Sequence, residues 1–177
     1  MPYRKAFVRI EIDEAMRTRA QREVAARQIY RTRASPFDTY VGILGELVWA
    51  KWRYGTIEQF DTLGTRGKSD DGDCEIKTSK TRVSEYSHLM VREDYAQKRQ
   101  PKCYVLVLIS SEQALNAETE AFVCGWATHA DVIAKPPRER ISNHTGRSQG
   151  YRCYEIRAAD LKPMSSLLAH LSSQSSK

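Results

Sequence analysis

A cluster of charged side chains in one short segment has the composition needed for phosphodiester chemistry. The segment Cys74-Glu75-Ile76-Lys77-Thr78 is predicted to be a strand, and it follows the acidic turn Asp70-Asp71-Gly72-Asp73. Side chains at i and i+2 of a strand share a face, so Glu75 and Lys77 should point the same way while Ile76 enters the core. The carboxylate could bind a divalent metal there, and the ammonium could address a phosphate or the attacking water.

The acidic turn offers competing metal ligands. If Asp71-Gly72 is the two-residue turn of a hairpin, Asp70 lies opposite Asp73 and on the same face as Glu75. This parity favours Asp70 over Asp71, and we rank the candidates in the order Asp70, Asp71, Asp73. Two or three such oxygens suit Mg²⁺, which is usually held by one or two carboxylates, waters and substrate phosphate. The alternative is that the turn is purely structural, because Asp-Gly is also a common hairpin signal.

A helix with an acidic residue on an apolar background precedes this cluster. Residues 42–52 have apolar side chains at three- and four-residue spacing, namely Leu44, Leu47, Val48 and Trp52. Glu46 lies among them. Gly42 and Gly45 each cost a helix about 1 kcal/mol relative to alanine, so we expect them to permit close approach to another backbone.

The order of these residues resembles the restriction-endonuclease-like nucleases, the PD-(D/E)xK superfamily. In that family a helix with a Gly-Glu pair precedes a hairpin with an aspartate, then Glu or Asp, any residue and Lys, and then a hydrophobic strand. This chain has Gly45-Glu46, Asp70, Glu75-Ile76-Lys77 and the strand Cys103 to Ile109. The resemblance covers about residues 37–110. No proline precedes the aspartate, and the gap from Asp70 to Glu75 is short for the family.

The resemblance implies a fold, a cofactor and roles for the residues. The implied fold is a single α/β domain with a central mixed β-sheet flanked by helices. The implied activity is hydrolysis of DNA phosphodiester bonds with Mg²⁺ or Mn²⁺. Lys77 would orient the attacking water and stabilise developing charge. The implied metal ligands are Asp70, Glu75, the Ile76 carbonyl and Glu46, either directly or through water, with Asp71 as the alternative aspartate.

Other functions remain open on the sequence alone. The enzyme could be a structure-selective nuclease such as a Holliday-junction resolvase instead of another endonuclease. It could also be a non-catalytic nucleic-acid-binding module that retains the fold. A homodimer is a further expectation, because one small active site cuts one strand and duplex cleavage usually recruits two sites by symmetry.

Positive charge points to a polyanionic partner, which we take to be DNA. The formal net charge is +6 and the sequence pI is near 9.2. Lys80 and Arg82 follow the Glu75 motif directly, and Arg31 and Arg33 leave the first predicted helix, so we expect these four to contact DNA. The alternative for that helix is that its arginines form the solvated face of an amphipathic helix.

Composition and length favour one globular domain over residues 1–177. Hydrophobic residues make up 41% and charged residues 28% of the chain, and no apolar run is long enough to span a membrane. The N-terminal Met1 to Lys5 is followed by charged residues instead of an apolar signal core, so we expect a cytoplasmic protein.

The remaining pattern predicts alternating helices and strands. Asp13 is the expected N-cap of the first helix, and Gly55 the C-terminal cap of the second. Residues 136–150 are a long polar stretch that either contacts nucleic acid or is an idle loop, and the Ser-rich tail should fray from about residue 172. Helices are predicted over 13–32, 37–54, 94–99, 129–133 and 159–171, and strands over 57–62, 73–79, 87–91, 104–109, 121–127 and 151–157.

Overall fold

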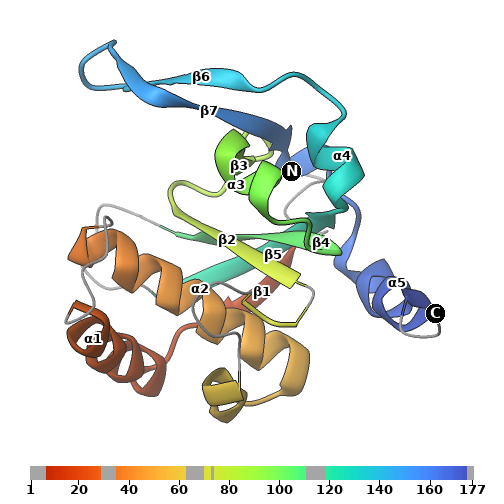
Figure 1. Ribbon diagram of the computed structural model, residues 1–177. Coiled ribbons are helices and arrows are strands. Elements are labelled where there is room, and N and C mark those ends of the chain that lie inside the picture. Colours follow the sequence, from red (N-terminus) through yellow and green to blue (C-terminus); the bar gives the residue numbers. More distant parts are fainter. Residues whose placement is uncertain (1–6, 29–34, 63–69, 73, 111–118, 175–177) are drawn as a thin grey trace.

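A four-stranded mixed sheet forms the centre of the computed structural model, which describes residues 7–28, 35–62, 70–72, 74–110 and 119–174 (Figure 1). Its strand order is β1 (Val8–Glu11), β5 (Glu120–Ala127), β4 (Cys103–Ile109) and β2 (Cys74–Lys80). β2 runs parallel to β4, whereas β4–β5 and β5–β1 are antiparallel. Every residue of β4 is buried, as expected for a strand covered on both faces. The α/β prediction with a mixed sheet is confirmed.

Two helices cover one face of this sheet. α1 (Glu14–Gln28) begins after Asp13, whose carboxylate accepts the Met16 N–H at 2.9 Å, so the predicted N-cap is confirmed. α2 (Pro36–Tyr54) begins after Ser35 and ends at Gly55, whose φ of 76° is the left-handed conformation that favours glycine. The predicted second helix and its cap are therefore confirmed. The predicted extension of the first helix to residue 32 lies outside the described residues beyond Gln28.

A second, three-stranded antiparallel sheet lies on the other side of the central sheet (Figure 1). Its order is β3 (His88–Arg92), β7 (Ser148–Arg157) and β6 (Arg138–Ile141). The short helices α3 (Glu93–Lys98) and α4 (His129–Ile133) accompany it, close to the predicted bounds. The interpretation of 136–150 as a loop was wrong, because β6 and the start of β7 pair there as a hairpin.

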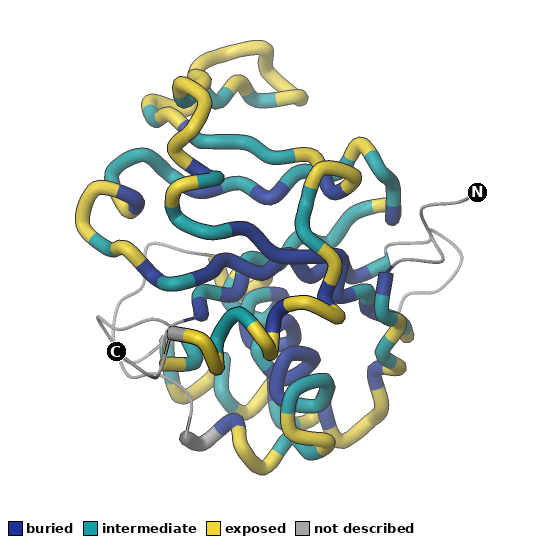
Figure 2. The backbone as a smooth tube through the Cα atoms, turned by 90° about the vertical axis from the view of Figure 1, so that its right-hand side faces the viewer, coloured by how far each residue is buried: buried dark blue, intermediate teal, exposed yellow. Residues whose placement is uncertain are grey.

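Alternate residues of β4 divide the core into two parts. Val105 and Val107 face α2, together with Ile76 of β2, and Leu106 and Leu108 face the second sheet. Figure 2 shows the buried segments as a band through the middle of the molecule, with exposed segments on the hairpin and the outer loops. The central sheet thus separates two apolar layers, which is why β4 is apolar on both faces. No helix in the described part of the chain has the length and apolar character to span a membrane.

Two predicted elements differ from the structure, and one observed strand was not predicted. The strand expected over 57–62 is a 3-10 helix, η2 (Glu58–Thr62). The helix expected over 159–171 is interrupted, because Pro163 holds an extended conformation and Lys162 pairs through its backbone with Trp126. The observed pieces are η3 (Ala158–Asp160), η4 (Met164–Ser166) and α5 (Leu167–Gln174). β1 was not predicted.

Candidate active site

The turn before β2 closes one residue later than the sequence suggested. Asp71 and Cys74 exchange two backbone hydrogen bonds, of 3.0 and 2.8 Å, and Gly72 adopts a positive φ of 55° between them. The expected turn placed Asp70 opposite Asp73; the observed pairing places Asp70 next to the start of β2, and Asp73 lies outside the described residues.

Asp70 is fixed at the outer edge of β2, the end strand of the central sheet. Its Oδ2 accepts the backbone N–H of Ile76 at 2.7 Å. The N–H and C=O of one strand residue point to the same side, so the Ile76 carbonyl is directed toward the same edge. The expected carboxylate and the expected carbonyl oxygen therefore lie on one side of the strand, while the Ile76 side chain is buried in the core.

Glu75 and Lys77 meet as their spacing predicts. Lys77 Nζ lies 2.8 Å from Glu75 Oε1, and the exposed fractions of the two side chains are 27% and 15%. The second carboxylate oxygen, Glu75 Oε2, is buried and has no hydrogen-bond partner among the described residues. A buried charged oxygen without a donor is costly, so this atom requires a further partner.

Glu46 reaches the site because Gly45 lets α2 press against β2. A Cβ at Gly45 would lie 1.7 Å from Thr78 Oγ1, so any larger residue would displace the helix from the strand. This confirms the expected close approach at Gly45, but not at Gly42, where a Cβ would meet nothing within 4 Å. Arg27 of α1 contacts Glu46, with Nη2 3.3 Å from Oε2.

The three carboxylates interact electrostatically. Burial, followed by the charges of Glu75 and Glu46, raises the pKa of Asp70 to about 7, against the Ile76 N–H and Lys77, which lower it. Burial also raises the pKa of Glu46, in part offset by the Arg27 guanidinium, and the Glu75 charge adds to the rise. Negative charge is therefore concentrated around this edge of β2 and only partly neutralised by Arg27 and Lys77.

Asp71 is occupied elsewhere. Its Oδ2 accepts hydrogen bonds of 2.7 Å from both the Trp49 indole N–H and the Tyr54 hydroxyl. Arg53 Nε lies 3.4 Å from the same oxygen. These contacts join the Asp71 carboxylate of the turn to α2.

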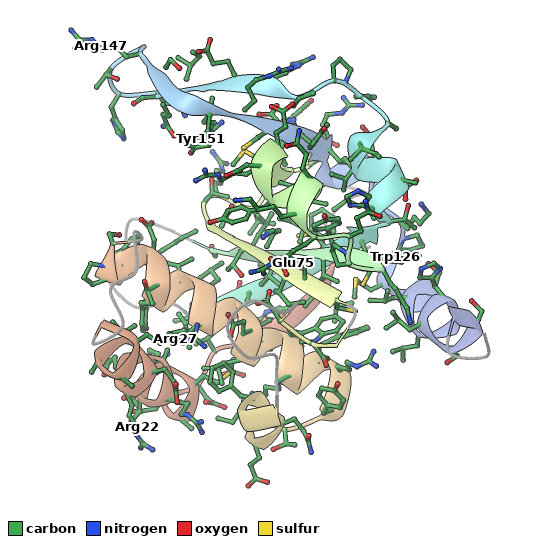
Figure 3. The ribbon with its side chains drawn as sticks, viewed as in Figure 1. Arg22, Arg27, Glu75, Trp126, Arg147 and Tyr151 are labelled. Atoms are coloured by element: carbon green, nitrogen blue, oxygen red, sulfur yellow. The ribbon has the colours of Figure 1, made fainter. Side chains whose placement is uncertain are left out.

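Of the four residues expected to contact DNA, two lie in the described part of the chain. Lys80 and Arg82 line a cleft of about 450 Å³ at the end of β2. Arg31 and Arg33 lie outside the described residues. Of the α1 arginines, Arg22 is exposed on the outer side of the helix (Figure 3), whereas Arg17 and Arg19 pair with Glu14 and Glu23 of the same helix.

Some residues near the site gave no signal in the sequence. Tyr104 of β4 pairs with Glu75 of the neighbouring strand β2. Its hydroxyl lies 3.1 Å from His129 Nδ1. Burial and the Glu75 charge raise the pKa of Tyr104 to about 12. Arg27 was one of several helix arginines until the fold placed it against Glu46. Each of these contacts joins separate elements, so no local spacing could have revealed it.

The described residues do not provide a complete set of protein ligands for a metal ion. Within the described ranges, no group of three or more His, Cys, Asp or Glu side chains is arranged to hold a metal ion. The chain matches no protein-family model, no curated protein and no solved structure in comparisons with each.

Proposed function

We propose that this protein is a divalent-metal-dependent deoxyribonuclease that hydrolyses DNA phosphodiester bonds as an endonuclease. The observation that carries the proposal is the buried Glu75 Oε2, which has no hydrogen-bond partner among the described residues; the same side chain contacts Lys77, and its charge acts on Asp70 and Glu46. Carboxylates brought together at a partly buried edge repel one another, and a divalent cation would relieve that repulsion.

The donor set fits Mg²⁺ better than a metal that needs a full protein cage. Mg²⁺ commonly takes one or two carboxylates and fills its other positions with water and substrate phosphate. Asp70 and Glu75 would provide the carboxylates and Ile76 a backbone oxygen, with Glu46 as a direct or water-mediated ligand. Mn²⁺ has the same preference for oxygen and could substitute. Asp71 is excluded from this set because Trp49 and Tyr54 already hold its carboxylate.

The chain's own residues have separable roles in this proposal. The bound cation would supply Lewis-acid charge to the scissile phosphate. Lys77 would release Glu75 and donate from Nζ to the attacking water or to a phosphate oxygen, stabilising charge as it develops. Glu75 and Asp70 would hold their negative charge at the β2 edge, and the Gly45–Thr78 contact would keep Glu46 in reach of them.

One observation favours a second candidate, a non-catalytic nucleic-acid-binding module. Two of the three carboxylates already have cationic partners, Glu75 with Lys77 and Glu46 with Arg27. In a module that only binds nucleic acid, these pairs would be permanent, and no metal would need to displace them.

Cleavage separates the two candidates. The purified chain is incubated with supercoiled plasmid, linear duplex, single-stranded DNA and a four-way junction, each with Mg²⁺, Mn²⁺ or chelator. We expect metal-dependent cleavage that Lys77→Ala abolishes and that the exposed-surface control Lys98→Ala retains. Preference for the junction would identify a structure-selective nuclease. Intact DNA in every lane, with binding retained, would reject the nuclease in favour of the binding module.

A further inference from the structure

A second polar cleft lies at the other end of β2 from the carboxylates. β2 ends at Lys80, and the chain then passes through Thr81 and Arg82 toward β3, while β6 of the second sheet lies across from it. The cleft has a volume of about 450 Å³. Its walls are formed by Ser79, Lys80, Thr81, Arg82, Ser84, Tyr86, Ser87, His88, Met90, Leu108 and Arg140.

The walls of this cleft are cationic. Lys80, Arg82 and Arg140 contribute positive charge and His88 can add more, whereas the lining contains no Asp or Glu. Three acids adjoin lining residues in sequence or register: Glu85 next to Ser84, Glu139 next to Arg140, and Glu155, which pairs with Met90 across β3 and β7; none of the three lines the cleft. Several serine and threonine hydroxyls complete a lining that can donate hydrogen bonds to anionic oxygens.

The two arginines of the cleft, among the described residues, lack the ion pairs that arginines elsewhere in the protein make. Arg92 pairs with Asp94, and Arg157 pairs with Asp160. Arg82 and Arg140 have no carboxylate partner in the part of the chain that the structure describes. Cations of two separate elements that face one cleft without counter-charges repel each other, and an anionic ligand would remove that cost.

The position of the cleft indicates which anion it takes. Lys77 and Ser79, a residue of the cleft wall, lie two residues apart on the same face of β2, a distance of about 7 Å, or about two base steps along a DNA duplex. A strand of nucleic acid whose scissile phosphate lies at Lys77 would therefore bring a flanking phosphate to the cleft. The β6–β7 hairpin adds one more positive charge, Arg147, at its far end (Figure 3).

We infer that this cleft binds the phosphodiester backbone of the nucleic acid a few nucleotides from the cleaved bond, with Arg82 and Arg140 as the principal contacts. The inference rests on the proposed nuclease function for the identity of the nucleic-acid substrate. The binding of phosphate by the cleft does not depend on that function. It assigns a role to Arg140, which comes from the second sheet and which the sequence placed in an undifferentiated polar stretch.

Binding without cleavage tests the cleft separately from the nuclease. Fluorescence anisotropy of a labelled short duplex is measured in chelator over a range of salt, for wild type, Arg82→Gln, Arg140→Gln and the double variant. We expect each single change to weaken binding about three- to tenfold and to reduce the slope of log Kd against log salt by about one. Arg22→Gln, on the outer side of α1, removes the same charge and should bind as wild type.

The outcomes distinguish the cleft from the active site. Wild-type affinity and salt slope in the double variant would overturn the inference even if the wild type cleaves DNA. Reduced binding in the variants, restored by Arg82→Lys and Arg140→Lys, would support the cleft even if no metal produces cleavage, and the nuclease proposal alone would then fail. Thermal unfolding of each variant verifies that it is folded. If a variant with Arg140→Gln loses binding only because it unfolds, and the folded Arg82→Gln binds as wild type, the inference would also be overturned.

Discussion

The two ends of β2 carry opposite charge in opposite settings. At its start, Glu75 is 15% exposed and interacts with Asp70 and Glu46. At its end, Lys80 and the exposed Arg82 open onto a cleft with no acidic lining. One edge strand thus separates a region suited to a cation from a region suited to phosphate, over a distance of about 20 Å.

The two ends also differ in how firmly they are held. Asp70 is fixed by the Ile76 N–H, and α2 is fixed by the fit of Gly45 against Thr78. Arg82 and Arg140 have long side chains that can adapt to a ligand. We therefore expect changes at the start of β2 to alter chemistry and stability together, and changes at its end to alter binding alone.

The largest expected effect is loss of cleavage in Glu75→Gln. The amide keeps the shape of the side chain but removes the charge that would hold a divalent cation, so cleavage should fall by about 1000-fold, comparable to the loss of a strong electrostatic contact in other active sites. Single-turnover cleavage at saturating protein measures this effect. The matched control is Glu11→Gln at the exposed end of β1, which should cleave at the wild-type rate; equal activity in the two variants would show that Glu75 has no part in the chemistry.

The pH dependence of stability should reveal the crowding at Asp70. Its folded pKa of about 7 lies above its ordinary value of 3.8, so the folded state binds the proton more tightly. Without metal, the free energy of unfolding should decrease as pH rises from about 4 to 7, by on the order of 3 kcal/mol.

Urea unfolding at a series of pH values, with chelator present, measures this decrease. Asp70→Asn should remove most of it, because the amide does not titrate, and should be more stable than wild type near pH 8. Added Mg²⁺ should stabilise the wild type most at high pH, where the carboxylate is ionised. A flat wild-type profile between pH 4 and 8 would contradict the crowding.

Two glycines of the same helix give a sharp test of the close contact that positions Glu46. Gly45→Ala places a Cβ 1.7 Å from Thr78 Oγ1, whereas Gly42→Ala meets nothing within 4 Å. The first change should destabilise the fold by about 2 kcal/mol through overpacking and reduce cleavage as Glu46 moves. The second should stabilise it by up to about 1 kcal/mol through helix propensity. Thermal unfolding of both variants compares them, and an equal effect of the two changes would contradict the packing.

Local spacing predicted the parts of the site that lie within one element. Glu75 and Lys77 share a face because strand side chains alternate. Asp70 still lies beside β2 although the turn differs, because its Oδ2 accepts the Ile76 N–H. Gly45 was recognisable because glycine is unfavourable inside a helix unless packing requires it.

Contacts between distant elements were not predictable in this way. Nothing in the polar pattern of 136–150 places Arg140 in the same cleft as Arg82, because that arrangement depends on the second sheet. The hairpin was missed because β6 and the first residues of β7, Ser148 to Gly150, are largely exposed and so lack an apolar face. The C-terminal helix is the opposite case, in which a predicted element is absent. The sequence pattern predicts one continuous helix, but the backbone pairing of Lys162 with Trp126 interrupts it.

The smallest expected effect comes from Arg27, which contacts Glu46 but is not itself a proposed metal ligand. Arg27 is 42% exposed and lies 3.3 Å from Glu46, so it competes with any cation for that carboxylate. Arg27→Gln should tighten Mg²⁺ binding about threefold, because it removes a positive charge next to the proposed metal position, and should cost less than about 1 kcal/mol of stability. Titration of the Mg²⁺-induced rise in unfolding temperature measures the affinity.

The matched control for Arg27 is Arg17→Gln on the same helix. Arg17 pairs with Glu14 at 2.9 Å, so this change also removes one arginine ion pair, but it leaves Glu46 untouched. Its Mg²⁺ affinity should equal that of the wild type. If Arg27→Gln binds Mg²⁺ no more tightly than Arg17→Gln, Glu46 does not contact the cation, and the acidic end of β2 reduces to Asp70, Glu75 and the Ile76 carbonyl.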